Sequence, residues 1–166
     1  MYKKEIINKM KNYFGDDQKR IQHALEVTSY AEKLISLHQE KDINQEVIIY
    51  SAILHDIGIK NAEKKYNSSA PKYQEIEGPP VARDILNRFP IEELIIKEVC
   101  EIIGNHHSPG KFNSNNFKIL CDADWLVNLP DEYDLSAKNK EEIIRVIDKL
   151  YLSEAGKRLA KRQFLS

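Results

Sequence analysis

Two adjacent polar residues, His55 and Asp56, directly follow the apolar run Ala52-Ile53-Leu54 in the segment AILHDIGIK. Such a run is typical of the end of a buried helix, so the two polar side chains should be buried as well. A buried imidazole or carboxylate without a partner costs roughly 1–3 kcal/mol even with partial compensation. The sequence therefore requires a partner for this pair.

Three more polar elements occur in apolar surroundings. They are His23 within an amphipathic helical pattern, His106-His107 at the end of IEELIIKEVCEIIGNHH, and Asp122 and Asp124 within LCDADWLVNL. Taken alone, His23 would be interpreted as a hydrogen-bonded core histidine. A divalent metal ion at the centre of a helical bundle would satisfy all four elements together. Imidazoles and carboxylates suit Mn, Fe, Co, Ni or Zn better than Ca, and Mg is a further alternative.

The elements that must position these residues are predicted to be helical. Apolar residues recur at helical spacing nearly throughout, and no alternating run predicts a strand with confidence. The expected helices are 2–13, 18–39, 44–57, 79–89, 91–104, 116–128, 139–151 and 153–163. The segments 61–73 and 107–115 are expected to be loops. The predicted fold class is all-α, a single-domain bundle of about seven or eight helices over residues 1–166.

Composition excludes several classes of protein. The 166 residues are enough for one domain with a core, and 25 Lys and Arg nearly balance 26 Asp and Glu, so there is no strong signal for nucleic-acid binding. No apolar run approaches the roughly 18 residues of a membrane span, and the N-terminus lacks the apolar region of a secretory signal. The two cysteines do not form a disulfide framework. A cytoplasmic location and no membrane partner are expected.

The order of the polar residues resembles the HD-domain metal-dependent phosphohydrolases, whose pattern is a first His, an adjacent His-Asp and a distal Asp. His23, His55-Asp56 and Asp124 match this pattern over about residues 17–130. The DAD-W-L stretch resembles the family's distal AD-x-L element, which favours Asp124 over Asp122 as a ligand. The whole chain also resembles small bacterial HD proteins described only as predicted hydrolases. The resemblance implies an HD-like bundle, with residues 131–166 as additional C-terminal helices.

The resemblance also raises the question of a second metal ion. Binuclear HD proteins have further histidines between the HD pair and the distal Asp, one of them in a segment resembling H-G-x-x-x-A. Here that segment reads EGPPVA, with Glu77 in place of the histidine, while His106 matches the later histidine. Glu77 could ligate a metal or could instead favour the start of its helix. The resemblance thus implies one tight site and leaves the second open.

The implied activity is hydrolysis of a phosphoester or phosphoanhydride in a small phosphorylated metabolite, favoured to be a nucleotide, by a metal-activated water. Asp56 would bind the metal and orient the water, and His107 would act as a general acid or contact the anion. Lys60 would neutralise charge on the phosphate. The candidate substrate contacts are Lys60, Lys64, Lys65, His107 and Lys111. Cyclic dinucleotides are disfavoured because the GYP element of HD-GYP phosphodiesterases is absent.

Two other functions remain as alternatives. One is an HD-type diiron oxygenase, which would require a complete six-ligand binuclear site and therefore depends on Glu77. The other is a non-catalytic metal- and nucleotide-binding sensor, which would bind a ligand without turnover. A homo-oligomer is compatible with the sequence.

Overall fold

The computed structural model describes residues 1–39 and 41–166. Within these residues the chain forms nine α-helices and one 3-10 helix, with no strand, which confirms the all-α prediction. The helices are α1 (Lys3–Phe14), α2 (Gln18–Leu37), α3 (Gln45–Leu54), α4 (Ile59–Tyr66), α5 (Pro71–Leu86), α6 (Glu93–Ile103), α7 (Asn115–Glu132), η1 (Leu135–Ala137), α8 (Lys140–Leu150) and α9 (Glu154–Phe164).

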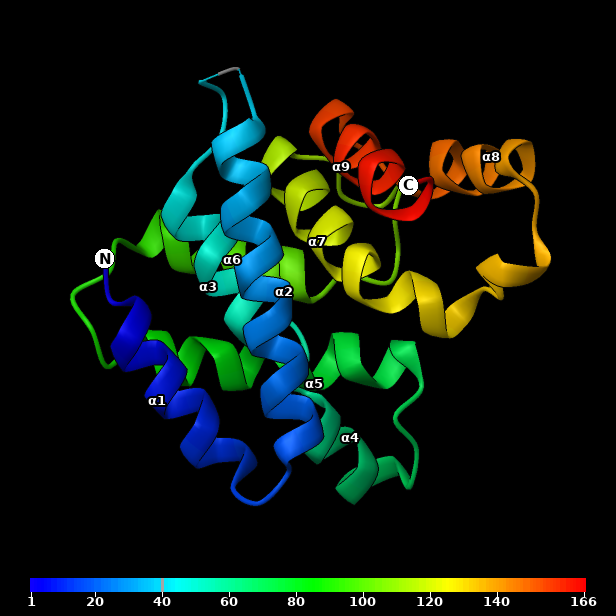
Figure 1. Ribbon diagram of the computed structural model, residues 1–166. Helices are drawn as coiled ribbons and strands as arrows, with labels where there is room; N and C mark the ends of the chain where they lie inside the picture. Colours follow the sequence, from blue (N-terminus) through cyan, green and yellow to red (C-terminus); the bar gives the residue numbers. More distant parts are fainter. Residues whose placement is uncertain (40) are drawn as a thin grey trace.

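Helix α2 runs through the middle of the bundle (Figure 1) and packs mainly against α3 and α7. Helix α3 also packs against α1, α6 and α7. Every residue of α3 from Val47 to Leu54 is buried, as expected for a helix that is apolar on all sides. His55 and Asp56, the HD pair, directly follow α3 and are therefore attached to a helix that is buried from Val47 to its last residue.

Polar N-caps fix where the three central helices begin. Asp17 accepts a hydrogen bond from the Arg20 N–H ahead of α2, and Asn44 caps α3 in the same way. Ser114 accepts a hydrogen bond from the Phe117 N–H at the start of α7. A fixed start sets the rotational phase of each helix, and so the direction of the polar side chains farther along it.

The segment 61–73 differs from the predicted loop. Helix α4 occupies its first part, with Ala62 buried, lysines in its last turn and a left-handed Asn67 (φ 51°) at its end. Positively charged lysines stabilise the C-terminal end of a helix, where the helix dipole is negative. Asn tolerates the left-handed backbone that ends many helices better than most residues. The loop from 107 to the start of α7 agrees with the prediction.

The predicted start of a helix at Pro79 is wrong. Helix α5 begins two turns earlier, where Pro71 occupies the first helical turn, and it continues through Pro79-Pro80. Two prolines inside a helix remove backbone hydrogen bonds, so local sequence alone favours a start there. Tertiary packing overrides that preference, because Gly78 and Glu77 are buried in the interior stretch of the helix just before these prolines.

Gly58 marks a close approach between the turn after α3 and helix α5. A Cβ atom at Gly58 would lie 2.5 Å from the Gly78 nitrogen and 2.7 Å from the Gln74 carbonyl oxygen, and backbone atoms cannot rotate away. Gly58→Ala should therefore lower the free energy of unfolding by about 1–3 kcal/mol, measured by urea denaturation. Asn61→Ala on α4 is the control and should change it by less than about 0.5 kcal/mol. An unchanged midpoint for Gly58→Ala would contradict the close approach.

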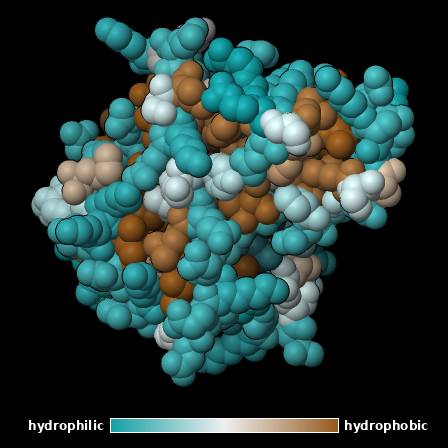
Figure 2. Space-filling view, viewed as in Figure 1, coloured by the Kyte–Doolittle hydropathy of each residue, from teal (hydrophilic) through white to brown (hydrophobic). Residues whose placement is uncertain are grey.

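The surface is mostly polar on the face shown in Figure 2, with apolar residues in separate patches, one of them over α8 and α9 at the upper right. Helix α8 packs mainly against α9, which in turn contacts α2 and α7. The two C-terminal helices thus form a hairpin joined to the body through α9. Among the described residues, no helix combines the length and the apolar character needed to cross a membrane.

Candidate metal centre

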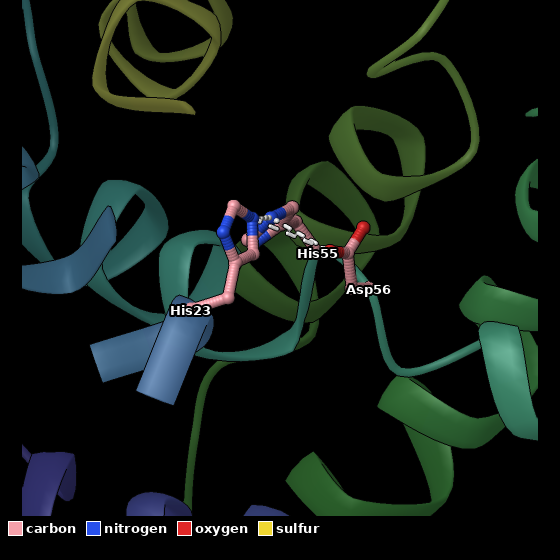
Figure 3. Close-up of side chains that lie close together, drawn as sticks. All are labelled: His23, His55 and Asp56. Carbon is pink, nitrogen blue, oxygen red and sulfur yellow. Dashed lines mark hydrogen bonds and ion pairs between the residues drawn. The ribbon is translucent and has the colours of Figure 1, made fainter. Parts of the chain in front are cut away.

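Four side chains from three parts of the fold meet near the centre of the bundle, and we call them the primary cluster: His23 on α2, His55 and Asp56 in the turn after α3, and Asp124 on α7. His23 Nε2 lies 3.2 Å from His55 Nε2 and 3.1 Å from Asp124 Oδ1. Asp56 Oδ2 lies 3.4 Å from the Nε2 atom of each histidine. Figure 3 shows His23 reaching from α2 towards the HD pair.

The hydrogen bonding of His55 determines which charge the primary cluster needs. His55 Nδ1 lies 2.8 Å from the Ala52 carbonyl oxygen, which can only accept, so Nδ1 carries a proton. A neutral His55 then presents the Nε2 lone pair to Asp56, Asp124 and His23. Lone pairs at these distances repel unless a proton or a cation lies among them, so the residues fit a divalent metal ion.

His106 repeats this geometry in the turn after α6. Its Nδ1 atom lies 2.7 Å from the Ile103 carbonyl oxygen, three residues earlier, as His55 Nδ1 does with Ala52. His106 Nε2 is buried, has no hydrogen-bond partner among the described residues, and lies 3.4 Å from Asp56 Oδ1. Asp56 therefore directs one oxygen to the primary cluster and the other to His106.

The charges of the primary cluster favour a cation. Burial alone would lower the pKa of His55, but the carboxylates of Asp56 and Asp124 raise it well above its ordinary value. Burial would raise the pKa of Asp56 and of Asp124, yet the neighbouring histidines together outweigh it, His55 with His106 at Asp56 and His55 with His23 at Asp124, so both pKa values are lowered. Both carboxylates thus stay ionised and attract positive charge, as a proton or as a metal ion.

A cavity of about 620 Å³ reaches the cluster from one side. Asp124, His106 and His107 line its inner end, so a molecule that enters it can contact the candidate metal ligands. The volume lies within the roughly 300–1,000 Å³ typical of small-molecule sites.

Comparison with known proteins agrees with this geometry. A family model for the HD domain matches residues 20–151, most of the chain. This chain belongs to the HD domain family. HD domains bind divalent metal ions, so membership supports a metal-dependent hydrolase in general, and the two His/Asp groups of the structure could hold such ions.

The HD fold is also found in a solved structure, the crystal structure of a predicted HD superfamily hydrolase from an uncultured Thermotogales bacterium. The two chains share 24% sequence identity with a TM-score of 0.68, and the match covers 99% of this chain and 86% of the other. At that identity the match shows the shared fold. A search of curated proteins gave no significant match.

His107, which directly follows His106, belongs to a second group of side chains that could hold a metal ion. One ligand atom from each of Asp56, His106 and His107 lies within 4.8 Å of the others. His107 Nε2 also lies 3.0 Å from Gln74 Oε1. His107 is exposed as a residue, but partial desolvation of its ring, together with the nearby His106, lowers its pKa to about 4. A neutral His107 suits a ligand or a hydrogen-bond donor better than a general acid at neutral pH.

Glu77, which stands where binuclear HD proteins have a histidine, has other partners. Lys65 Nζ lies 2.7 Å from Glu77 Oε1, and the Tyr66 hydroxyl donates to Oε2 at 3.2 Å. Among the described residues, Glu77 belongs to neither group of closely spaced ligand atoms. Its role as a metal ligand stays a prediction, and the structure provides Asp56, His106 and His107 as the more compact second group.

The predicted phosphate-binding lysines are not brought into the primary cluster. Lys60 Nζ donates to the Tyr13 carbonyl oxygen at 2.9 Å and lies over the Tyr13 ring, so α1 holds it. Lys65 pairs with Glu77, and Lys64 and Lys111 are exposed. Of the five proposed substrate contacts, only His107 lines the cavity.

Asp122 and Asp124 face different parts of the HD bundle. Asp124 belongs to the primary cluster, whereas the buried Asp122 carboxylate accepts hydrogen bonds from the Leu152 and Ser153 N–H groups, both at 2.8 Å, and from the Ser153 hydroxyl. Burial raises the pKa of Asp122 to about 6, although these hydrogen bonds oppose the shift. Asp122 therefore fastens the start of α9 to α7.

Asn128 is a site residue that sequence reasoning missed. Its Nδ2 atom donates to Asp124 Oδ1 at 2.9 Å from one turn farther along α7. The signal was present, because a residue four positions after a candidate ligand shares its helix face. Such a hydrogen bond orients a ligating carboxylate.

We expect Asn128→Ala to weaken metal binding by about 10–100-fold without unfolding the protein, since Asp124 loses the hydrogen bond that orients it. Isothermal titration of chelator-treated protein with Mn²⁺ or Co²⁺ measures the change. Asn12→Ala on the exposed side of α1 serves as the matched control. Equal affinities for the wild-type and Asn128→Ala proteins would show that Asp124 is oriented without this contact.

Proposed function

We propose that this protein hydrolyses a phosphoester or phosphoanhydride bond of a small phosphorylated metabolite, with a nucleotide as the favoured substrate class. The observation that carries the proposal is the set of ionised carboxylates and imidazole lone pairs converging at the inner end of a cavity of about 620 Å³. A general HD hydrolase requires such a metal centre, and the cavity gives a phosphorylated molecule access to it.

Four residues would hold the ion: His23, His55, Asp56 and Asp124. A divalent ion bound there would polarise the phosphate and activate a water molecule. Asp56 is suited to orient a water molecule because its two oxygens face different imidazoles. His107 lines the cavity and can contact a phosphate oxygen, and Gln74 lies 3.0 Å from its Nε2 atom, while the buried residues of α3 from Val47 to Leu54 exclude solvent from behind the cluster.

The test combines elemental analysis of the purified protein with an activity screen. Chelator-treated protein is reconstituted with Mn, Co, Ni, Zn or Mg, and phosphate release is measured from nucleotides, sugar phosphates and other phosphorylated metabolites. We expect hydrolysis that depends on the added metal and is absent in His55→Ala. His38→Ala is the matched control, since His38 lies 15 positions after His23, about 22 Å along α2. If no phosphorylated compound is hydrolysed by any metal-loaded form, the proposal is wrong.

The oxygenase alternative is less well supported by the geometry. It requires a complete binuclear ligand set, and Glu77 is engaged by Lys65 and Tyr66. Oxygen consumption by the iron-loaded protein on an organic substrate would favour the oxygenase over the hydrolase. Binding of nucleotide without turnover would favour the sensor.

A second, weaker metal-binding event is expected at Asp56, His106 and His107. Two cations a few ångströms apart repel each other, so the second ion should bind more loosely, and phosphate should strengthen it by bridging. Calorimetric titration of the wild-type protein should show one tight and one weak event. His106→Ala should remove the weak event and keep the tight one, whereas Glu77→Gln should keep both. Loss of the weak event in Glu77→Gln alone would identify Glu77 as the ligand instead.

A further inference from the structure

One wall of the cavity is formed by a single face of α7. The α7 residues that line it are Cys121, Asp124, Trp125, Asn128 and Glu132. Their spacing places them in one stripe along the helix. Glu132 lies eight positions after Asp124, so the stripe extends about 12 Å along the helix beyond Asp124. The cavity thus continues well past the space that a phosphate group would occupy.

The facing wall comes from the end of α8 and the segment that follows it. Lys149, Leu150 and Leu152 line the cavity there. Because the Leu152 N–H donates to the buried Asp122 carboxylate, this wall is fastened to α7 beside the stripe. The cavity is therefore lined by the indole of Trp125 on one side and by two leucine side chains from a segment that is fixed to the same helix.

Several groups in this outer part are available to a ligand. Trp125 is only partly buried, and its ring meets that of Tyr133 at a tilt, with the two centroids 6.2 Å apart. Lys149 and Glu132 are exposed, and neither forms an ion pair with any described residue. Asn128 uses its amide nitrogen for Asp124, which leaves its amide oxygen as an acceptor.

We propose that Trp125 stacks against the nucleobase of a nucleotide whose phosphate lies at the primary cluster. This assignment rests on the proposed phosphohydrolase function and adds the residue that selects the organic part of the substrate. A flat ring with polar edges fits a wall that combines an indole and two leucines with Asn128, Glu132 and Lys149. A hydrocarbon chain would offer no hydrogen bond to Asn128, Glu132 or Lys149.

Trp125 is the single tryptophan of the chain, so its fluorescence reports occupancy of the outer cavity directly. The probes are adenosine and uridine, which lack phosphate and therefore bind without turnover. We expect both nucleosides to quench the fluorescence in a saturable manner, and ribose 5-phosphate to leave it nearly unchanged. No saturable quenching by either nucleoside at millimolar concentration would overturn the assignment.

Three variants separate stacking from general packing, with nucleoside affinity measured by calorimetry. Trp125→Phe keeps an aromatic ring and should change the affinity by no more than about threefold, whereas Trp125→Leu should weaken it by about 5–100-fold. Tyr30→Leu replaces an aromatic residue outside the cavity lining and should change it by less than about twofold. Equal affinities of Trp125→Leu and wild-type protein would overturn the assignment.

The wild-type protein and Trp125→Leu also distinguish an error in the role of Trp125 from an error in the proposed hydrolase function. If the metal-loaded enzyme hydrolyses nucleotides but Trp125→Leu binds nucleosides as tightly as wild type, only the role of Trp125 is wrong. If nucleosides bind through Trp125 but no metal-loaded form releases phosphate from any nucleotide, the hydrolase proposal is wrong and a nucleoside-binding cavity remains.

Discussion

The Asp56→Ala protein should purify without a stoichiometric divalent metal and should show no metal-dependent hydrolysis. Asp56 directs one oxygen to the primary cluster and the other to His106, so its removal affects both candidate ion positions. Metal bound only by the native state stabilises it by about 4 kcal/mol when the free metal is a thousand times its Kd. We therefore expect the rise in Tm that metal produces in the wild-type protein to disappear in Asp56→Ala.

Elemental analysis and thermal unfolding with and without Mn²⁺ measure both effects. The His38→Ala variant controls for loss of a surface histidine contact, because His38 pairs with Asp42 and lies at the far end of α2 from His23. His38→Ala should retain the metal and its effect on Tm. Stoichiometric metal in purified Asp56→Ala would exclude Asp56 as an essential ligand.

The two aspartates of the segment LCDADWL should have separable effects. In Asp124→Asn the primary cluster loses one of its two negative charges, so metal-dependent hydrolysis should fall by more than the roughly 10–100-fold typical of residues that only support a ligand. In Asp122→Asn one carboxylate oxygen becomes an amide nitrogen, which is itself a donor. It would face at least one of the three donors that Asp122 now accepts from, the Leu152 N–H, the Ser153 N–H and the Ser153 hydroxyl. The free energy of unfolding should then fall by about 1–3 kcal/mol, with metal still bound.

Urea denaturation and metal analysis of both variants test this separation. Ser153→Ala removes a hydroxyl that donates to Asp122 and also caps α9, so it should resemble Asp122→Asn in stability and wild type in metal content. Loss of metal in Asp122→Asn with retention in Asp124→Asn would reverse the assignment of the two carboxylates.

Much of this protein is determined by local patterns that the sequence displays directly. Helical spacing of apolar residues predicts an all-α fold, and the apolar run of α3 predicts that His55 and Asp56 lie at the end of a buried helix. The order of His23, the adjacent His55-Asp56 and Asp124 resembles the pattern of the HD family, and this resemblance implies a metal-binding set. The helical features depend on residues within a few turns of one another, where the helix itself fixes the geometry.

Other features depend on long-range contacts that no local pattern contains. The DAD-W-L stretch favours Asp124 as the ligand, but the role of Asp122 depends on the start of α9, thirty residues later in the chain, which supplies its hydrogen-bond donors. Glu77 is drawn to Lys65 and Tyr66 by the packing of α4 on α5. The double proline continues a helix instead of starting one, since tertiary burial of that segment outweighs the lost backbone hydrogen bonds.

The cavity is the clearest case of a feature that only the tertiary structure decided. The sequence shows Trp125 as one more large residue on a helix, where core packing is the ordinary interpretation. Its place beside the primary cluster follows from its position next to Asp124, but it lines a cavity because the C-terminal hairpin brings Leu150 and Leu152 against the same space. A helix specifies which residues share a face, whereas the elements that approach that face from distant parts of the chain decide whether it becomes core, an anchor or a binding site.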